Sequence, residues 1–301
     1  MNKSPTKQYD TFIIGHISKD EIVVNNHTEV RPGGAVEAAS YAAAAGNFRT
    51  GVLTKTARPD RALLSMFSIL NPEDIYFVES KHTTSIRNVY LTPDMEKREC
   101  FGLGHADPFV VDDLPTVQSK IFHLAGLIAG DYDNELLPYL AQKGLLAVDM
   151  QGFLRTIMPD GRMVLVDWPE KTHLLPYVHF LKTDAAEAQV MTGTSDRRFA
   201  VRQLHDWGAA EVMITHNTEV LVFDGREYYT WPLKPRNLSG RTGRGDTCFS
   251  AYITERLHTP PREALLYAAA MVSLKMETPG PFRGTRQDVE DYIRRFYRPA
   301  Y

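Results

Sequence analysis

The chain has 301 residues, of which 43% are hydrophobic and 24% are charged, and its formal net charge is −3 at pH 7. These values are typical of a globular protein, so they exclude a mainly disordered, collagen-like or coiled-coil chain. The sequence has no basic stripe and no run of like charges, which argues against a nucleic-acid binder and against a binder of anionic membranes.

The two cysteines, Cys100 and Cys248, cannot make a disulfide framework, and their small number fits a reducing compartment. The first ten residues are polar and lack the apolar core of a signal peptide. The most apolar stretches, 121–130 and 264–274, are far shorter than the roughly 20 residues that a membrane-spanning helix needs. We therefore expect a cytoplasmic protein.

Short apolar segments alternate with helical segments along most of the chain. The expected strands are 11–15, 51–54, 120–124, 145–149, 178–181, 211–215 and 220–223. The expected helices lie within 33–46, 61–70, 134–143, 185–191, 197–207, 245–257, 262–277 and 287–296. This alternation predicts an α/β fold with a mostly parallel sheet covered on both faces. Ligands of such sheets bind at the carboxyl ends of the strands.

Residues 84–102 interrupt the alternation. They contain two strand-like runs, 85–92 and 97–102, around a turn at residues 93–94 (Pro-Asp). No internal repeat or long linker occurs. We therefore expect one domain, 1–301, with a small β-strand lid whose hairpin lies at about 84–102. The apolar residues of that hairpin need a cover, and we expect a homodimer that forms through the lid.

The segment 239–248 (SGRTGRGDTC) is the strongest candidate for a chemical site. Its glycines can present backbone N–H groups, an apolar helical pattern follows at once, and Asp246 lies in the first turn of that helix. Exposed N–H groups at a helix N-terminus bind anions. The same residues also fit a plain turn in which Asp246 only favours the helix start.

In its context, this segment resembles the second signature of the ribokinase (PfkB) family of carbohydrate kinases, written D-T-T-G-A-G-D. Thr242, Gly243, Gly245 and Asp246 match that signature. Other segments resemble the family's motifs in the family's order, and the likeness covers about residues 11–295. They are GHISKD (15–20), PGGAVEAASYAAAAG (32–46), FLKTDAAEAQVMTG (180–193), MITHNTEVLVFDG (213–225) and LKMETPGPF (274–282). VDMQGFLR (148–155) resembles a segment of the inositol-kinase branch.

The resemblance implies a ribokinase-like three-layer sandwich that transfers a phosphoryl group from ATP to a hydroxyl of a small polyol, a sugar or a cyclitol, with Mg²⁺ as cofactor. Asp246 would be the catalytic base. The backbone N–H groups of the loop, which includes Gly243, Arg244 and Gly245, would hold the developing negative charge. No P-loop motif exists in the chain.

The resemblance also assigns binding residues. Glu187 would help to place Mg²⁺, through water. The nucleotide-binding candidates are Asp184, Thr215, Asn217 and Thr242. The substrate-binding candidates are Asp20, Gly33, Gly34, Asp149, Gln151 and Arg155. Three alternatives stay open on the substrate side: a solvated turn at Asp20, a plain helix start at the paired glycines, and an ordinary loop with a surface arginine at 148–155.

The loop departs from the signature at three positions. Gly240 stands in place of the first aspartate, which in several relatives helps to bind a monovalent cation, and Arg241 and Arg244 add two fixed positive charges. We therefore expect activity that depends on Mg²⁺ and hardly on K⁺. Three other functions stay open: a nucleoside kinase of the same fold, a non-catalytic sugar or nucleotide sensor, and a nicotinamide-dependent oxidoreductase, although no G-x-G-x-x-G motif follows the first strand.

Overall fold

The computed structural model describes residues 6–25, 27–91 and 98–298. In this part of the chain the main element is a 9-stranded sheet in the order β15-β14-β13-β12-β9-β8-β1-β4-β5. The strands from β5 to β13 run parallel, and β14 and β15 complete the sheet antiparallel. Its strands are β1 (Lys7–Ile14), β4 (Thr50–Ala57), β5 (Ile75–Ser80), β8 (Val117–Leu124), β9 (Leu145–Asp149), β12 (Phe180–Asp184), β13 (Glu211–Thr215), β14 (Glu219–Phe223) and β15 (Tyr228–Pro232).

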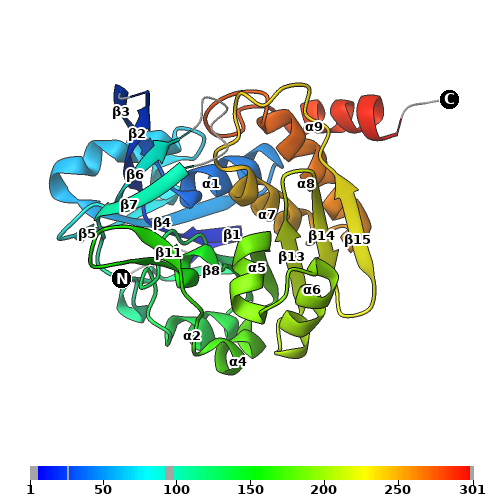
Figure 1. The fold of residues 1–301 in the computed structure, drawn as a ribbon, viewed down its shortest axis with the longest axis horizontal. Coiled ribbons are helices and arrows are strands. Elements are labelled where there is room, and N and C mark those ends of the chain that lie inside the picture. Colours follow the sequence, from blue (N-terminus) through cyan, green and yellow to red (C-terminus); the bar gives the residue numbers. More distant parts are fainter. Residues whose placement is uncertain (1–5, 26, 92–97, 299–301) are drawn as a thin grey trace.

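Helices cover both faces of this sheet (Figure 1). On one face lie α1 (Ala35–Ala45), α7 (Arg244–Glu255), α8 (Pro261–Lys275) and α9 (Arg286–Tyr292). On the other lie α2 (Leu136–Ala141), α4 (Lys171–Leu174), α5 (Ala185–Thr192) and α6 (Arg197–Asp206). The short helix α3 (Gln151–Leu154) follows β9 directly. The expected three-layer α/β fold class is therefore confirmed.

The side chains of the central strands explain the two helical layers. Successive residues of a strand point to opposite faces, so a strand buried on both faces is apolar throughout. In β13, Val212 and Ile214 pack into the cluster that contains Leu204 of α6, whereas Met213 packs into the cluster that contains Phe249 of α7. The sheet thus separates two apolar cores.

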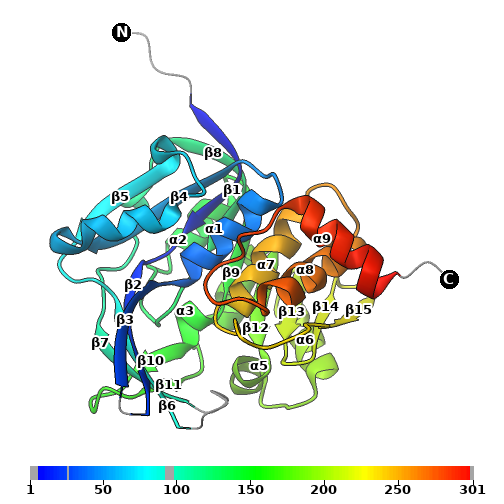
Figure 2. The ribbon, with the colours of Figure 1, turned by 90° about the horizontal axis from the view of Figure 1, so that it is seen from above.

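A second sheet forms the lid, in the order β3-β2-β6-β7. Figure 2 shows it beside the carboxyl ends of the parallel strands. The predicted hairpin corresponds to β6 (Ser85–Tyr90) and β7 (Arg98–Gly104), which pair antiparallel. The predicted turn at 93–94 and the strand ends Thr92 and Lys97 lie outside the described residues.

The lid also contains a hairpin that the sequence did not predict, β2 (Ser18–Val24) and β3 (His27–Gly33). Both strands carry charged residues and much of β3 is exposed, so neither shows the apolar alternation by which strands are recognised. Two more short strands, β10 (Arg155–Ile157) and β11 (Met163–Leu165), pair antiparallel, and the neighbouring Arg162 bridges to Phe101 of β7.

Two helix predictions are wrong in type or length. The segment predicted as an α-helix over 61–70 is a 3₁₀ helix, Arg58–Phe67, which has a proline in its first turn and buries only Met66 and Phe67. The helix predicted over 287–296 is α-helical only to Tyr292 and continues as a π-helical turn, Ile293–Tyr297. The sequence also did not predict β5 and β15. Within the described residues, no helix has both the length and the apolar character needed to span a bilayer.

Candidate active site

The glycine-rich loop enters α7 beside the carboxyl ends of β12 and β13. A Cβ atom on Gly245 would lie 3.3 Å from Nζ of Lys182 in β12 and 3.9 Å from Oγ1 of Thr215 at the end of β13. Gly243 is the N-cap of α7 with φ +76°, a conformation that favours glycine. The predicted loop residues therefore meet the strand edge at which ligands of parallel sheets bind.

Asp246 lies in the first turn of this 12-residue helix. A Cβ atom on Gly243 would lie 3.9 Å from Oδ2 of Asp246, so the carboxylate is next to the loop. The first backbone N–H groups of a helix have no partner inside the helix and carry a partial positive charge. The predicted base and the predicted anion-binding groups thus lie together at one helix N-terminus.

Arg244 begins α7 and connects the loop to the turn between β13 and β14. One of its Nη2 hydrogens is donated to Oδ1 of Asn217. Thr215 is close by, and its hydroxyl donates to the carbonyl oxygen of Thr183 over 3.4 Å. Three residues predicted to contact the donor or its phosphates, Arg244, Asn217 and Thr215, therefore lie at or next to the loop.

A buried ion pair lies directly beneath the loop. Nζ of Lys182 is 3.0 and 2.9 Å from the two carboxylate oxygens of Asp149 and 4.0 Å from Oε2 of Glu187. Burial disfavours the charged lysine, but the carboxylates of Asp149, Glu187, Asp246 and Asp184 together raise the pKa of Lys182 above its usual value. The ammonium group therefore stays charged beneath Gly245.

Asp149 was predicted to bind substrate, but the structure gives it other partners. It is buried, both its oxygens face Lys182, and Oδ1 also accepts the N–H of Gln151. Burial raises the pKa of Asp149, and Lys182 opposes that rise. Its role as a substrate ligand stays a prediction.

Asp184 and Glu187 form the N-terminal capping box of α5. Oδ1 of Asp184 accepts the N–H of Glu187 over 2.8 Å, and Oε2 of Glu187 accepts the N–H of Asp184 over 2.7 Å. Burial raises the pKa of Glu187 to about 7. Together with Asp149 and Asp246, these residues place four carboxylates around one lysine, Lys182. Hard carboxylate oxygens beside an anion-binding loop are a donor set that fits Mg²⁺.

Asp20 of β2 marks the acceptor side of the site. Its Oδ1 is buried and has no hydrogen-bond partner among the described residues. Burial raises the pKa of Asp20 to about 6, against the opposing charges of Arg98 and Arg155. A Cβ atom on Gly33 would lie 2.9 Å from Oδ2 of Asp20, so a larger residue there would push the carboxylate out of its place. The alternative of a solvated turn at Asp20 is wrong.

The other acceptor-side candidates lie on neighbouring elements. Gly34 caps α1 with φ +121°, and a Cβ there would lie 2.6 Å from the carbonyl oxygen of His16. Gln151 accepts a hydrogen bond from Nη2 of Arg155 over 2.9 Å, which fixes this pair in the turn after β9. Arg155 lies close enough to Asp20 to lower its pKa. The structure therefore connects the predicted 148–155 segment to the lid aspartate.

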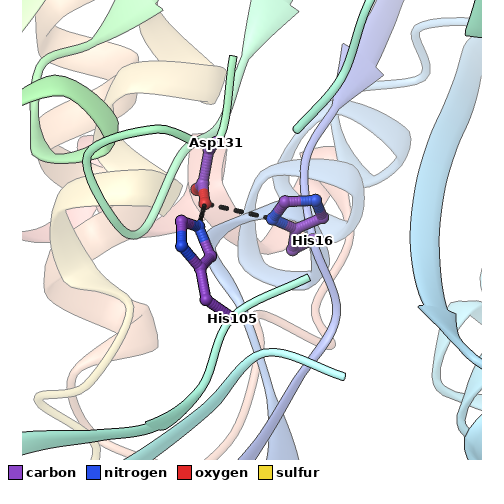
Figure 3. Close-up of side chains that lie close together, drawn as sticks. All are labelled: His16, His105 and Asp131. Carbon is purple, nitrogen blue, oxygen red and sulfur yellow. Dashed lines mark hydrogen bonds and ion pairs between the residues drawn. The ribbon is translucent and has the colours of Figure 1, made fainter. Parts of the chain in front are cut away.

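His16, which precedes the lid strand β2, and His105, which follows the lid strand β7, meet at Asp131 in a hydrogen-bonded cluster (Figure 3). Oδ1 of Asp131 is 3.1 Å from Nδ1 of His16 and 2.8 Å from Nε2 of His105, and Oδ2 accepts the N–H groups of Leu127 and Ile128. The ligand atoms of the three side chains lie within 4.8 Å of one another, a spacing that a metal ion could bridge. Hydrogen bonds alone account for the arrangement.

Sequence reasoning missed Lys182 and Lys275. Lys182 follows two apolar residues in the buried strand β12, and Lys275 ends an apolar helix with its side chain buried. A lysine is almost never fully buried unless it is paired, so a lysine within an apolar run was the available signal. The His16 cluster had no such signal, because its three residues are far apart in the sequence.

The chain is similar to solved structures of kinases. A pyrophosphate-dependent kinase in the ribokinase family, in complex with a pyrophosphate analog and myo-inositol, is 34% identical, with a TM-score of 0.84 over 93% of this chain and 99% of that one. The sulfate complex of a pyrophosphate-dependent kinase in the same family is 37% identical, with a TM-score of 0.84 and the same shares covered. Ribokinase from Arabidopsis thaliana with ribose and ATP shares the fold at 16% identity and a TM-score of 0.74, over 95% of this chain and 98% of that one.

Among curated proteins, a cytidine kinase from Thermococcus kodakarensis is 28% identical over 252 residues, which cover 81% of this chain and 87% of that kinase. No model of a protein family matches the chain. The structural relatives at 34% identity and above are kinases, and they match nearly the whole chain.

Proposed function

The chain belongs to the ribokinase family of kinases, and on that premise we propose that it transfers a phosphoryl group from ATP to a hydroxyl group of a small polyol, a cyclitol or a sugar. One observation carries the proposal. The carboxylate of Asp246 lies at the N-terminus of α7 beside a glycine loop, and the Lys182 ammonium lies beneath that loop. A base, an anion-binding site and a fixed positive charge are what phosphoryl transfer requires.

In the proposed reaction, Asp246 accepts the proton of the attacking hydroxyl. The hydroxyl oxygen forms a bond to the γ-phosphorus, the bond from that phosphorus to the bridging oxygen breaks, and ADP leaves. The N–H groups of Gly243, Arg244 and Gly245 hold the negative charge on the transferring group. Thr242, Thr215, Asn217 and Asp184 are our candidates for contacts with the nucleotide.

Asp184 and Glu187 would hold Mg²⁺, through water, at the end of β12. The bound ion would neutralise phosphate charge. Gly33, Gly34, Gln151 and Arg155 would bind the acceptor together with Asp20, because the buried Oδ1 of Asp20 lacks a donor and a polyol hydroxyl supplies one.

Pyrophosphate is a second candidate donor. The relatives at 34% and 37% identity are pyrophosphate-dependent, whereas the ATP-bound ribokinase is only 16% identical. Because a cytidine kinase is 28% identical to this chain, nucleosides also stay among the candidate acceptors. The donor and the acceptor must therefore be tested together.

The test is a matrix of ATP or pyrophosphate against myo-inositol, ribose and cytidine, with product detected by phosphorus NMR. We expect turnover with one polyol that requires Mg²⁺, and Asp246→Asn should lower kcat by about 10²–10⁴. The matched control is Asp206→Asn, an exposed aspartate at the end of α6, which should be unchanged. Product with cytidine alone would favour the nucleoside kinase, and full turnover by Asp246→Asn would contradict the assigned base.

We also propose that the lid forms a homodimer. The side chains of Val30 in β3 and Leu103 in β7 are 55% and 44% exposed, and β3 and β7 are the outer strands of the lid sheet. Apolar residues on edge strands favour pairing with a second copy. Light scattering should give twice the chain mass for the wild type, and Val30→Glu should shift the protein to a monomer. A wild-type monomer at micromolar concentration would refute the dimer.

A further inference from the structure

Lys275, the last residue of α8, is only 1% exposed. Its Nζ donates to the carbonyl oxygen of Gly240 over 2.5 Å and to the carbonyl oxygen of Thr242. Both acceptors belong to the loop that leads into α7, so a buried ammonium group ties the catalytic loop to the end of a different helix. Two backbone carbonyls around one cation are an unusual use of a lysine, because lysine is rarely buried without a carboxylate partner.

The loop is closed tightly around this contact. The N–H of Gly240 donates to the carbonyl oxygen of Met276 over 2.7 Å, and a Cβ atom on Gly240 would lie 1.7 Å from the carbonyl oxygen of Thr278. No side chain of any kind fits at position 240 without movement of the backbone. The turn after α8 therefore contacts the loop through its backbone, and the Lys275 side chain contacts it through two hydrogen bonds.

The direction of the held carbonyls matters for the anion site. A trans peptide unit is planar, and its C=O and N–H groups point in opposite directions. The carbonyl of Thr242 shares its peptide unit with the N–H of Gly243. Because Lys275 fixes the carbonyl on one side of the loop, that N–H points to the other side. The same argument applies to the carbonyl of Gly240 and the N–H of Arg241.

Charged groups from two helices face the ammonium. The carboxylates of Asp246 in α7 and Glu37 in α1 attract it, and the guanidinium of Arg244 repels it. Burial has the largest effect and lowers the pKa of Lys275 to about 8. The side chain is therefore charged at neutral pH and loses its proton at a moderately alkaline pH.

We propose that Lys275 is a positioning residue that serves as a built-in monovalent cation for the catalytic loop. Its ammonium group holds the carbonyls of Gly240 and Thr242 and thereby aims the loop N–H groups at the transferring phosphoryl group. This inference rests on the proposed kinase function. It assigns the charge that stands in for a bound cation to Lys275, and not to Arg241 or Arg244.

Chemical rescue tests the proposal. Lys275→Ala leaves a cavity between two carbonyls, which a small cation can enter. We expect kcat of this variant to fall at least about 10²-fold, the usual effect of losing an oxyanion-stabilising donor. Added KCl, NH₄Cl or methylammonium chloride should restore it at least tenfold at constant ionic strength, with tetramethylammonium chloride as the balancing salt. The wild type and the matched surface control Lys120→Ala should not respond, because Lys120 lies outside the site and its side chain is 56% exposed.

A pH profile provides a second readout. The wild-type rate should fall above about pH 8, as Lys275 loses its proton, and this decline should be absent from the potassium-rescued Lys275→Ala enzyme, because K⁺ does not titrate. Lys275→Met, which fills the space without a charge, should be inactive and should not be rescued. Thermal unfolding of each variant verifies that it is folded.

The outcomes separate the two claims. A wild type without turnover on any donor and acceptor would contradict the proposed function. The role of Lys275 would then be tested by whether added cations restore donor binding to Lys275→Ala. An active wild type together with a folded Lys275→Ala that no cation rescues would overturn the role of Lys275. A tenfold or larger activation of the wild type by KCl, or full activity of Lys275→Met, would overturn it even if Lys275→Ala does not fold.

Discussion

Replacement of Lys182 by methionine should destabilise the protein in a pH-dependent way. Methionine keeps most of the volume of lysine but removes the charge. The side chains of Lys182 and Asp149 are only 5% and 2% exposed, and both carboxylate oxygens lie within 3.0 Å of the ammonium. The variant would leave Asp149 buried beside the carboxylates of Glu187 and Asp246, which also face the lysine in the wild type.

The loss of stability has a ceiling set by protonation. Without the lysine, burial and the neighbouring carboxylates raise the pKa of Asp149 further, and the group takes up a proton. An unfolded aspartate has a pKa of about 3.9, and each unit is worth about 1.4 kcal/mol, so neutralising Asp149 costs about 4 kcal/mol at pH 7. At pH 5 the same step costs only about 1.5 kcal/mol. Removal of one partner of a buried ion pair typically costs about 3–5 kcal/mol, in agreement with the value at pH 7.

Urea denaturation at pH 7 and at pH 5 measures both values. In the wild type burial already raises the pKa of Asp149 to about 6. Because the loss of Lys182 raises this pKa further, the variant gains stability relative to the wild type as the pH falls. The surface control Lys120→Met, whose side chain is 56% exposed, should change stability by less than about 0.5 kcal/mol at either pH. Adding Asp149→Asn to Lys182→Met should remove the part of the pH dependence that comes from Asp149. A loss that is equal at both pH values would refute the reasoning.

Three further predictions follow from single contacts. Gly240→Ala should lower the free energy of unfolding by about 1–3 kcal/mol and reduce kcat, because its Cβ would overlap the carbonyl oxygen of Thr278; a urea titration that gives wild-type stability would contradict the tight closure. Asp20→Asn should raise KM for the polyol about tenfold or more and leave KM for the donor unchanged in initial-rate assays, whereas a change in the donor constant alone would remove Asp20 from the acceptor site. His16 and His105 hold the pKa of Asp131 well below its usual range in spite of burial. Asp131 therefore stabilises the fold above about pH 4, and this contribution fades at lower pH. Urea titrations at pH 7 and pH 3 should show a smaller pH dependence of stability for Asp131→Asn than for the wild type, and an unchanged pH dependence would contradict the contact.

The sequence predicted the fold class because its signals are local. Alternating apolar runs and helical segments are enough to indicate a parallel sheet with helices on both faces. The start of α7 was predicted within one residue, since a glycine loop followed by Asp246 and an apolar helical pattern has few other interpretations. Local signals failed for β2 and β3, whose charged residues form a lid that is stabilised by pairing with β6 rather than by an apolar face.

The missing part of the candidate site consists of contacts between distant segments. Lys182 contacts Asp149, and Lys275 contacts Gly240 and Thr242, only because the sheet and the helices bring these distant segments together. Asp149 shows the same limit: its place at the end of a strand predicts a substrate ligand, which stays a prediction, and gives no sign that its neighbour across the sheet is a lysine. Position in the chain indicates which edge of the sheet a residue reaches, and only the packing decides what the residue meets there.

The two buried lysines lie near opposite ends of the same loop and have different partners. Lys182, beneath Gly245, faces four carboxylates, which raise its pKa in spite of burial. Lys275, beside Gly240, has backbone carbonyls as its hydrogen-bond acceptors, and the carboxylates of Asp246 and Glu37 do not offset its burial, so its pKa falls to about 8. Because Lys275 is fixed on α8, its hydrogen bonds to Gly240 and Thr242 orient the loop before substrate arrives. A rise in pH should therefore release the Gly240 end of the loop, while the ion pair between Lys182 and Asp149 beneath Gly245 stays intact.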